Sequence, residues 1–265
     1  MDLDGLLDVA RRAAHAGGEI LVQHFGALRD VRAKAPGDWV SEADLASELA
    51  VRTMLERESG LPVHGEEEGG ARADIEWLVD PLDGTANFVH GFDAVGVSIG
   101  LVDHGQPVVG VVHAPFLANG DSVGRTYTAT RGGGAHRDGT PIRVSTRRPS
   151  EAIVATGFPF RNKQLLPEYL ESFLPALGVF EDVRRVGAAS LDLCWAAEGV
   201  FDGYFELRLG PWDVAAGALI VREAGGVVTD WAGDPDAWLP SGNIVAGAPD
   251  IHAALLAVTH NRGEP

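Results

Sequence analysis

Residues 77–88 read WLVDPLDGTANF, and the fold is inferred outward from this stretch. The apolar residues before Asp80 predict a buried strand. Pro81 follows directly and has no backbone N–H group, so the chain is expected to leave the β-ladder there. Asp83 comes two residues later. In an Asp-Pro-x-Asp turn both carboxylates can point into one space.

The next two residues, Gly84 and Thr85, predict a tight turn followed by a short helix. Free N–H groups at the start of a helix favour an oxyanion or a phosphate. Mg²⁺ prefers oxygen ligands and is usually held by a few carboxylates, waters and substrate phosphate. Two carboxylates beside such a turn therefore suggest a metal–phosphate site. The alternative is an ordinary Asp-rich surface turn.

The overall charge sets a constraint on this site. The chain has 38 acidic and 21 basic residues and a formal net charge of −17. This balance argues against nucleic acid or an anionic membrane as a primary partner. It is also unfavourable for an anionic substrate. Either the substrate is not an anion, or cations stand between it and the carboxylates.

Length and composition indicate an ordinary globular protein. A chain of 265 residues can bury one large core or two small ones. It has no run of about 18 apolar residues, so no membrane span is expected. The acidic N-terminus predicts an amphipathic helix rather than a signal peptide. The single cysteine, Cys194, excludes an internal disulfide and favours a reducing, cytoplasmic location.

The pattern of elements changes along the chain. Helices are expected at 3–25 and from Ser41 to about 58, where Ser41 and Asp44 have capping-box character. Strands dominate up to about residue 144, including 142–144, and strands and helices then alternate. We therefore predict a single unit, 1–265, with an α+β lobe at 1–145 and an α/β lobe at 146–265.

Two further segments carry acids at the ends of predicted elements. The first, GEEEG at residues 65–69, follows a β run and on its own is better explained as a solvated acidic loop. The second, GPWDVAAGALIVREAGG at residues 210–226, predicts a helix made almost entirely of small and apolar residues. Such a helix must be buried, so Asp213 in its first turn would be a costly buried carboxylate, for which a metal is an economical partner.

Together these motifs resemble the inositol monophosphatase family. The resemblance rests on residues 65–67, on DPLDGTANF at 80–88, and on WDVAAG at 212–217 followed by EAGG at 223–226. The order and spacing match over roughly residues 5–255. The resemblance implies a layered αβαβα sandwich of the α/β class, like that of fructose-1,6-bisphosphatase, and a Mg²⁺-dependent, lithium-sensitive phosphatase.

The resemblance also implies roles for individual residues. The implied metal ligands are Glu66, Asp80, Asp83, Asp213 and the backbone carbonyl of Leu82. The implied catalytic residues are Asp44 and Thr85, which would orient the nucleophilic water, together with Glu67. The implied substrate-binding residues are Gly84, Thr85, Gly187, Ala188, Ala189, Glu206 and Asp213. Lys34 and Asp38 fall in a segment that resembles a metal-binding loop of the family.

The charge constraint is met if two or three Mg²⁺ ions offset these acids, with Li⁺ as an expected inhibitor. The expected substrate is a small polyol phosphate, first of all inositol-1-monophosphate. Histidinol phosphate, a nucleotide 3′-phosphate or a sugar bisphosphate are the alternatives. By resemblance we expect a homodimer.

Three competing interpretations remain. GVSIG at residues 96–100 matches the nucleophile elbow of serine hydrolases, centred on Ser98, although that elbow requires a strand, a turn and a helix. Asp83-Gly84-Thr85 is similar to the phosphorylated aspartate loops of other phosphatases, although their residue order is missing. Some relatives in the family are thought to bind transcription machinery, which suggests a regulatory binding role alongside catalysis.

Overall fold

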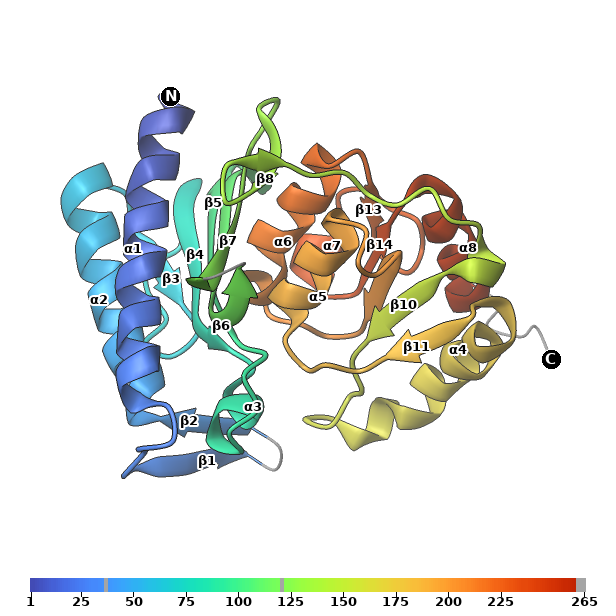
Figure 1. The fold of residues 1–265 in the computed structure, drawn as a ribbon, viewed down its shortest axis with the longest axis horizontal. Helices are drawn as coiled ribbons and strands as arrows, with labels where there is room; N and C mark the ends of the chain where they lie inside the picture. Colours follow the sequence, from blue (N-terminus) through green and yellow to red (C-terminus); the bar gives the residue numbers. More distant parts are fainter. Residues whose placement is uncertain (36–37, 120–121, 261–265) are drawn as a thin grey trace.

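The computed structural model describes residues 1–35, 38–119 and 122–260, and helices and sheets alternate in it in the order αβαβα (Figure 1). The outer helical layer consists of α1 (Leu3–His24) and α2 (Glu42–Ser59), which pack side by side on one face of the first sheet. A small hairpin of β1 (Val31–Ala35) and β2 (Asp38–Ser41) joins the two helices. The predicted layered sandwich is confirmed.

The first sheet has seven strands in the order β3-β4-β5-β6-β7-β8-β9. Only the pair β3–β4 is parallel among its described pairings. The strands are β3 (Val63–Gly65), β4 (Ile75–Asp83), β5 (Gly96–Asp103), β6 (Gln106–Asn119), β7 (Ser122–Thr130), β8 (Gly134–Arg137) and β9 (Thr140–Pro141). The strand predicted at 142–144 is wrong, because β8 and β9 complete this sheet first.

The central helical layer consists of α5 (Ala189–Ala197) and α6 (Pro211–Glu223), which lie between the two sheets (Figure 1). Two glycines paired across β5 and β6, Gly100 and Gly110, let α6 approach the sheet closely. A Cβ atom at Gly100 would lie 2.9 Å from the Cβ of Ala215, and one at Gly110 would lie 2.8 Å from the carbonyl oxygen of Ala216. The position of α6, and hence of its first turn, is therefore set by two strand positions that lack side chains.

The second sheet has five strands in the order β11-β10-β12-β14-β13. These strands are β10 (Ile153–Thr156), β11 (Asp182–Arg184), β12 (Gly203–Glu206), β13 (Val227–Thr229) and β14 (Ile244–Gly247). Its outer face is covered by α4 (Leu166–Val179) and α8 (Pro249–His260). The short helices are α3 (Thr85–Val89), α7 (Trp238–Ser241) and the 3₁₀ turns Pro149–Glu151 and Lys163–Leu165.

The apolar cores follow these layers. One cluster fills the space between the N-terminal helices and the first sheet, a second surrounds α5 and α6, and a third lies under α4 and α8. The chain passes from the first sheet to the second between β9 and β10, and the lobe boundary near residue 145 stays a prediction. None of the described helices is long and apolar enough to cross a membrane.

Candidate active site

The end of β4 carries the two aspartates of the opening motif. The prediction that the chain leaves the ladder at Pro81 is wrong, because β4 continues to Asp83. Its register against β5 shifts between the pair Asp80–Ser98 and the pair Asp83–Gly96, so the proline is absorbed in a β-bulge. The backbone N–H of Leu82 donates to Oδ1 of Asp80 at 2.9 Å and stabilises the irregular segment.

The turn after β4 forms as predicted. Gly84 has a φ of 90°, which a residue with a side chain rarely adopts, and α3 begins at Thr85. The Thr85 hydroxyl lies 3.0 Å from Oδ1 of Asp44 and 3.1 Å from the carbonyl oxygen of Leu82. Because the hydroxyl has a single proton, only one of these acceptors can receive it fully. The Leu82 carbonyl, predicted to bind metal, therefore faces Thr85.

Asp44 is fixed by the start of its own helix. The capping box predicted at Ser41 and Asp44 is confirmed: Oδ2 of Asp44 accepts from the Ser41 N–H at 2.7 Å and from the Ser41 hydroxyl at 2.6 Å. This leaves Oδ1 for Thr85. Burial raises the pKa of Asp44, while the bonds from Ser41 and Thr85 act in the opposite direction. The capping interaction thus orients the carboxylate toward α3.

Three acids from separate segments converge beside this pair. One oxygen each of Glu66, Asp80 and Asp213 lies within 4.8 Å of the others, which makes a potential metal-ion site among the described residues. Glu66 follows β3, Asp80 lies near the end of β4, and Asp213 lies in the first turn of α6. The carboxylate of Asp213 also accepts from the N–H of Gly210 at 2.6 Å.

The electrostatics of this acidic cluster, Glu66, Asp80 and Asp213, are unfavourable for the protein alone. Burial, followed by the charge of Asp213, raises the pKa of Glu66 to about 8, while Arg161 and Lys34 act in the opposite direction. Burial and the neighbouring carboxylates also hold the pKa of Asp80 well above its usual range. Burial and mutual repulsion thus oppose ionisation of Glu66 and Asp80 together, and added positive charge would favour it.

Asp83 is held differently. Its carboxylate faces the start of α5, where it accepts from the N–H groups of Ala189 at 3.2 Å and Ser190 at 2.7 Å and from the Ser190 hydroxyl at 2.5 Å. Burial and the charge of Asp213 raise the pKa of Asp83 to about 6, against the effect of these donors. The charge of Asp213 thus acts on Asp83, whereas the hydrogen bonds that Asp83 accepts come from the start of α5.

The turn that carries Glu66 is anchored by a residue that we did not predict. Glu48 on α2 is buried, and its carboxylate accepts from the N–H groups of Glu67 at 2.9 Å and Glu68 at 3.0 Å. Arg52, one turn along α2, donates to Glu48 at 2.8 Å. A single acid on a helix carries no local signal for this role. Only the pattern of a charged residue on an otherwise buried helix face could have indicated it.

The side chain of Glu67, predicted as catalytic, pairs with a cation. Lys34 on β1 donates to Oε1 of Glu67 at 2.6 Å. Burial raises the pKa of Glu67 and the bond from Lys34 opposes this rise. The backbone of Asp38 belongs to β2, but its side chain lies outside the described part of the structure.

Asp83 and Asp213 line a cleft of about 190 Å³, whereas Glu66 and Asp80 are not among its lining residues. Most of the predicted substrate-binding residues line it: Gly84, Thr85, Gly187, Ala189, Glu206 and Asp213. Ala188 does not, because it is fully buried and its Cβ would lie 3.3 Å from a Cβ at Gly84. Glu206 accepts a hydrogen bond from the Tyr204 hydroxyl, and burial raises the pKa of Glu206 to about 7. Arg161, Arg185 and Arg208 also line the cleft, and Nη2 of Arg161 lies 3.6 Å from Oε1 of Glu66.

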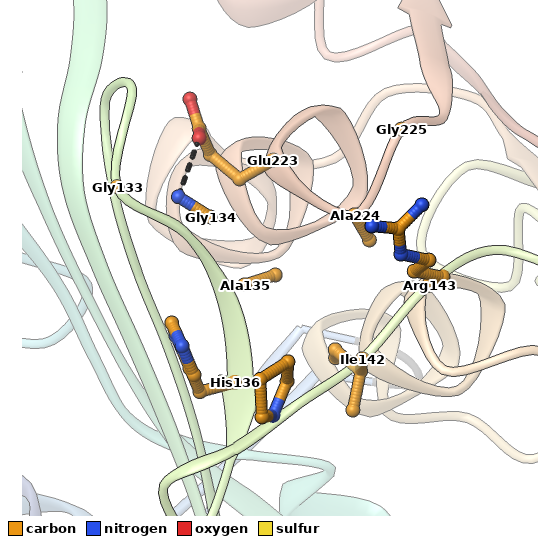
Figure 2. A pocket seen from close by; sticks show the side chains of 10 residues that line it. Gly133, Gly134, Ala135, His136, Ile142, Arg143, Glu223, Ala224 and Gly225 are labelled. Carbon is orange, nitrogen blue, oxygen red and sulfur yellow. Dashed lines mark hydrogen bonds between the residues drawn. The ribbon is translucent and has the colours of Figure 1, made fainter.

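A second cavity, of about 400 Å³, lies at the opposite end of α6 (Figure 2). There Glu223 accepts from the N–H groups of Gly132 at 2.8 Å and Gly134 at 2.9 Å. Figure 2 shows the hydrogen bond between the carboxylate of Glu223 and the backbone nitrogen of Gly134 as a dashed line. The glutamate of the EAGG motif thus joins the end of α6 to the turn before β8. This structural contact explains why a glutamate stands there, and no catalytic role is needed.

The serine-hydrolase interpretation is wrong. Ser98 is fully buried in β5, which continues to Asp103 and then turns into β6 and not into a helix. Its hydroxyl donates to the carbonyl oxygen of Trp212 at 2.9 Å. A nucleophile elbow requires an exposed serine between a strand and a helix.

The alternating layers and the buried acidic cleft define an inositol monophosphatase fold. The sequence model of the Inositol monophosphatase family matches residues 2–264, and this chain belongs to that family. Among curated proteins, the chain is 40 % identical over 263 residues to the putative Nus factor SuhB of Neisseria meningitidis serogroup B, covering 97 % of this chain and 98 % of that protein. It is 39 % identical over 261 residues to the Nus factor SuhB of Escherichia coli K12, covering 95 % and 94 %.

Two solved structures show the same fold. The crystal structure of the extragenic suppressor protein suhB from Bartonella henselae has a TM-score of 0.89 at 35 % identity, covering 97 % of this chain and 99 % of that one. An inositol monophosphatase from Anabaena has a TM-score of 0.85 at 33 % identity, covering 98 % and 97 %. The family and the fold are thereby shown.

Proposed function

We propose that this protein is a Mg²⁺-dependent phosphomonoesterase. The observation that carries this proposal is the convergence of Glu66, Asp80 and Asp213, one of which, Asp213, lines the same cleft as Thr85 of the Asp44–Thr85 pair. These elements come from distant parts of the chain, and burying so many carboxylates together has a stability cost that folding alone does not explain. A phosphate site with divalent cations accounts for both facts.

The donor set fits magnesium. All three side chains of the acidic cluster offer carboxylate oxygens, which hard cations prefer over nitrogen or sulfur. Asp83 and the Leu82 carbonyl stay proposed ligands that would complete the set. When bound, such ions lower the pKa of a coordinated water and stabilise charge on the departing oxygen.

The protein's own groups would prepare the nucleophile. With its proton directed to Oδ1 of Asp44, the Thr85 hydroxyl can accept a hydrogen bond from water. A water that donates a hydrogen bond to the Thr85 oxygen would direct a lone pair into the cleft. Its proton would pass to the Thr85 oxygen as the Thr85 proton passes to the Asp44 carboxylate. Glu67, paired with Lys34, would act on the turn that carries Glu66 and not on the water.

For the substrate, we propose a small polyol phosphate, first inositol-1-monophosphate. Glu206 supports this choice, since a carboxylate in the cleft wall accepts hydrogen bonds from hydroxyl groups. The three arginines that line the cleft favour one of the alternatives, an ester with a second phosphate, such as a sugar bisphosphate. Histidinol phosphate and nucleotide 3′-phosphates complete the set to be compared.

The test is phosphate release from this panel of esters, with and without Mg²⁺ and Li⁺. We expect hydrolysis that requires Mg²⁺, is inhibited by Li⁺, and falls by about 10³-fold or more in Asp213→Asn. Near-normal turnover by Asp213→Asn at saturating Mg²⁺ would refute the proposed site. A phosphoprotein labile to hydroxylamine would instead support the covalent aspartyl mechanism.

The names of the similar curated proteins support a second function. Several relatives that match nearly the whole chain at 38–40 % identity are named Nus factor SuhB. We propose that this chain also has a binding role of that kind, with transcription machinery as its partner. A pull-down with Asp213→Asn as bait separates the two functions: retained capture of transcription proteins shows that binding is independent of catalysis, and the absence of capture by both wild type and variant contradicts the role.

We also expect a homodimer, which sedimentation equilibrium measures.

A further inference from the structure

Two serines connect the first sheet to the helices α5 and α6. One donates a hydrogen bond from a helix to the sheet, and the other donates from the sheet to a helix. Ser190, at the start of α5, donates its hydroxyl to Oδ2 of Asp83 on β4 at 2.5 Å. Ser98, in the middle of β5, donates to the carbonyl oxygen of Trp212 at 2.9 Å, one residue before Asp213. Ser190 on α5 thus contacts the end of β4 that carries Asp83. Ser98 on β5 contacts the first turn of α6, which carries Asp213, and both serines are buried.

We propose that Ser190 is a positioning residue for the acidic site, with Ser98 as its counterpart on the other lobe. This inference rests on the proposed phosphatase function. Ser190, which is not among the predicted metal-binding, catalytic or substrate-binding residues, would orient the Asp83 carboxylate. Ser190 does not line the cleft, so its action passes through Asp83.

The contacts of Asp83 explain why one hydroxyl has this effect. The N–H groups of Ala189 and Ser190 reach one carboxylate oxygen each, at 3.2 Å and 2.7 Å. The Ser190 hydroxyl adds a second donor to Oδ2, at 2.5 Å. Three donors fix the plane of the carboxylate, and only its remaining lone pairs can face the acidic cluster. Groups that orient a ligand in this way typically contribute 10- to 100-fold in metal affinity.

The experiment compares Ser190→Ala with Ser190→Cys in the full-length protein. Alanine removes the donor, whereas cysteine keeps similar volume and offers only a weak S–H donor. The readouts are Mg²⁺ affinity by calorimetry in the absence of substrate, kcat and KM separately, and the melting temperature. Ser172→Ala, a buried serine on α4 away from the cleft, is the matched control.

We expect Ser190→Ala to weaken Mg²⁺ binding by about 10-fold and to lower kcat by a similar factor with little change in KM. Ser190→Cys should fall between Ser190→Ala and wild type, and Ser172→Ala should bind Mg²⁺ like wild type. In an Asp83→Asn background, Ser190→Ala should add little further loss, because both changes act on one interaction. Ser98→Ala should add its own loss to that of Asp83→Asn.

Two outcomes would overturn the inference, and they are distinguishable. If wild type shows Mg²⁺-dependent hydrolysis but Ser190→Ala changes only the melting temperature, as Ser172→Ala does, the serine is merely structural and the proposed function stands. If wild type neither binds Mg²⁺ nor hydrolyses any ester of the panel, the proposed function fails and the role of Ser190 fails with it.

Discussion

The hydroxyl of Thr85, on the first residue of α3, lies 3.0 Å from Oδ1 of Asp44 on α2, and the two residues are 41 positions apart in the sequence. Thr85→Val replaces the hydroxyl by a methyl group of nearly the same size. We expect kcat for the best ester of the panel to fall by about 100-fold, because the proposed water loses its acceptor and its proton route. The melting temperature should also fall by about 2–4 °C, because the buried Asp44 carboxylate loses a hydrogen-bond donor.

The control for this prediction is Thr53→Val on α2, where the hydroxyl donates only to a backbone carbonyl of the preceding helical turn. Thr85→Ser keeps the hydroxyl and should retain most of the activity. A Thr85→Val enzyme with kcat within a factor of three of wild type would show that the water is oriented by other groups.

The carboxylate of Glu48 accepts from two backbone N–H groups, one at each oxygen. Glu48→Gln retains the shape but has only one acceptor oxygen, so its amide group would face either the Glu67 or the Glu68 N–H as a second donor. We expect the free energy of unfolding to fall by about 2 kcal/mol and the affinity for Mg²⁺ by about 10-fold. Chemical denaturation and calorimetry measure the two effects.

Glu56→Gln is the matched control, since Glu56 lies on the same helix, is half-exposed and also contacts Arg52, at 3.6 Å. It should leave both quantities unchanged. If Glu48→Gln lowered stability but left Mg²⁺ affinity intact, the turn of Glu66 would not depend on α2.

For Glu223 we expect a loss of stability without a loss of activity. Its carboxylate also accepts from two N–H groups, those of Gly132 and Gly134, but far from the acidic cluster. Glu223→Gln should lower the free energy of unfolding by about 1–2 kcal/mol and leave kcat and KM unchanged. A large loss of kcat would instead connect the 400 Å³ cavity to catalysis. Glu151→Gln, on an exposed 3₁₀ turn, is the control for stability.

His113 on β6 predicts how stability depends on pH. Its ring stacks on that of His15 with centroids 4.4 Å apart, and its Nδ1 lies 3.0 Å from the Thr126 hydroxyl. Burial, followed by the charge of His15, lowers the pKa of His113 from 6.5 to about 4. Folding therefore favours the neutral ring, and the stability from this residue is present above pH 6.5 and is lost as pH falls toward 4.

Between pH 7.5 and pH 5 this loss should amount to about 2 kcal/mol in the free energy of unfolding. The measurement is urea denaturation at both pH values, for wild type and for His113→Asn, which keeps a polar atom near the Nδ1 position but does not titrate. The other charges near the pair, on Arg11, Glu19 and Asp138, are common to both proteins. An equal loss in the two proteins would contradict the role of His113.

Much of the fold could be predicted because the relevant information is local. The capping box at Ser41, the left-handed glycine before α3 and the apolar composition of α6 each depend on a few neighbouring residues. The errors occurred where pairing between strands decides. A β-bulge lets β4 continue through Pro81, and the partner strand that permits it lies 15 or more residues later in the sequence. The short strands β8 and β9 depend on their neighbours in the same way.

The positions of the candidate site residues were predictable for a different reason. Acids in motifs stand out by composition, and the structure brings Glu66, Asp80 and Asp213 together and pairs Asp44 with Thr85. Supporting residues such as Glu48 and Ser190 do not stand out, because a lone glutamate or serine is common on any helix. Their contacts join segments 19 to 107 positions apart, and only the packed fold determines them.

The helix α6 has Asp213 in its first turn and Glu223 at its last residue. Each added residue turns an α-helix by about 100°, because about 3.6 residues complete one turn. Insertion or deletion of one residue between these two acids would swing one of them out of place, either away from the metal ligands or away from the glycine turn. The length of this segment is therefore constrained at both ends, in addition to the small residues that its packing on the first sheet requires.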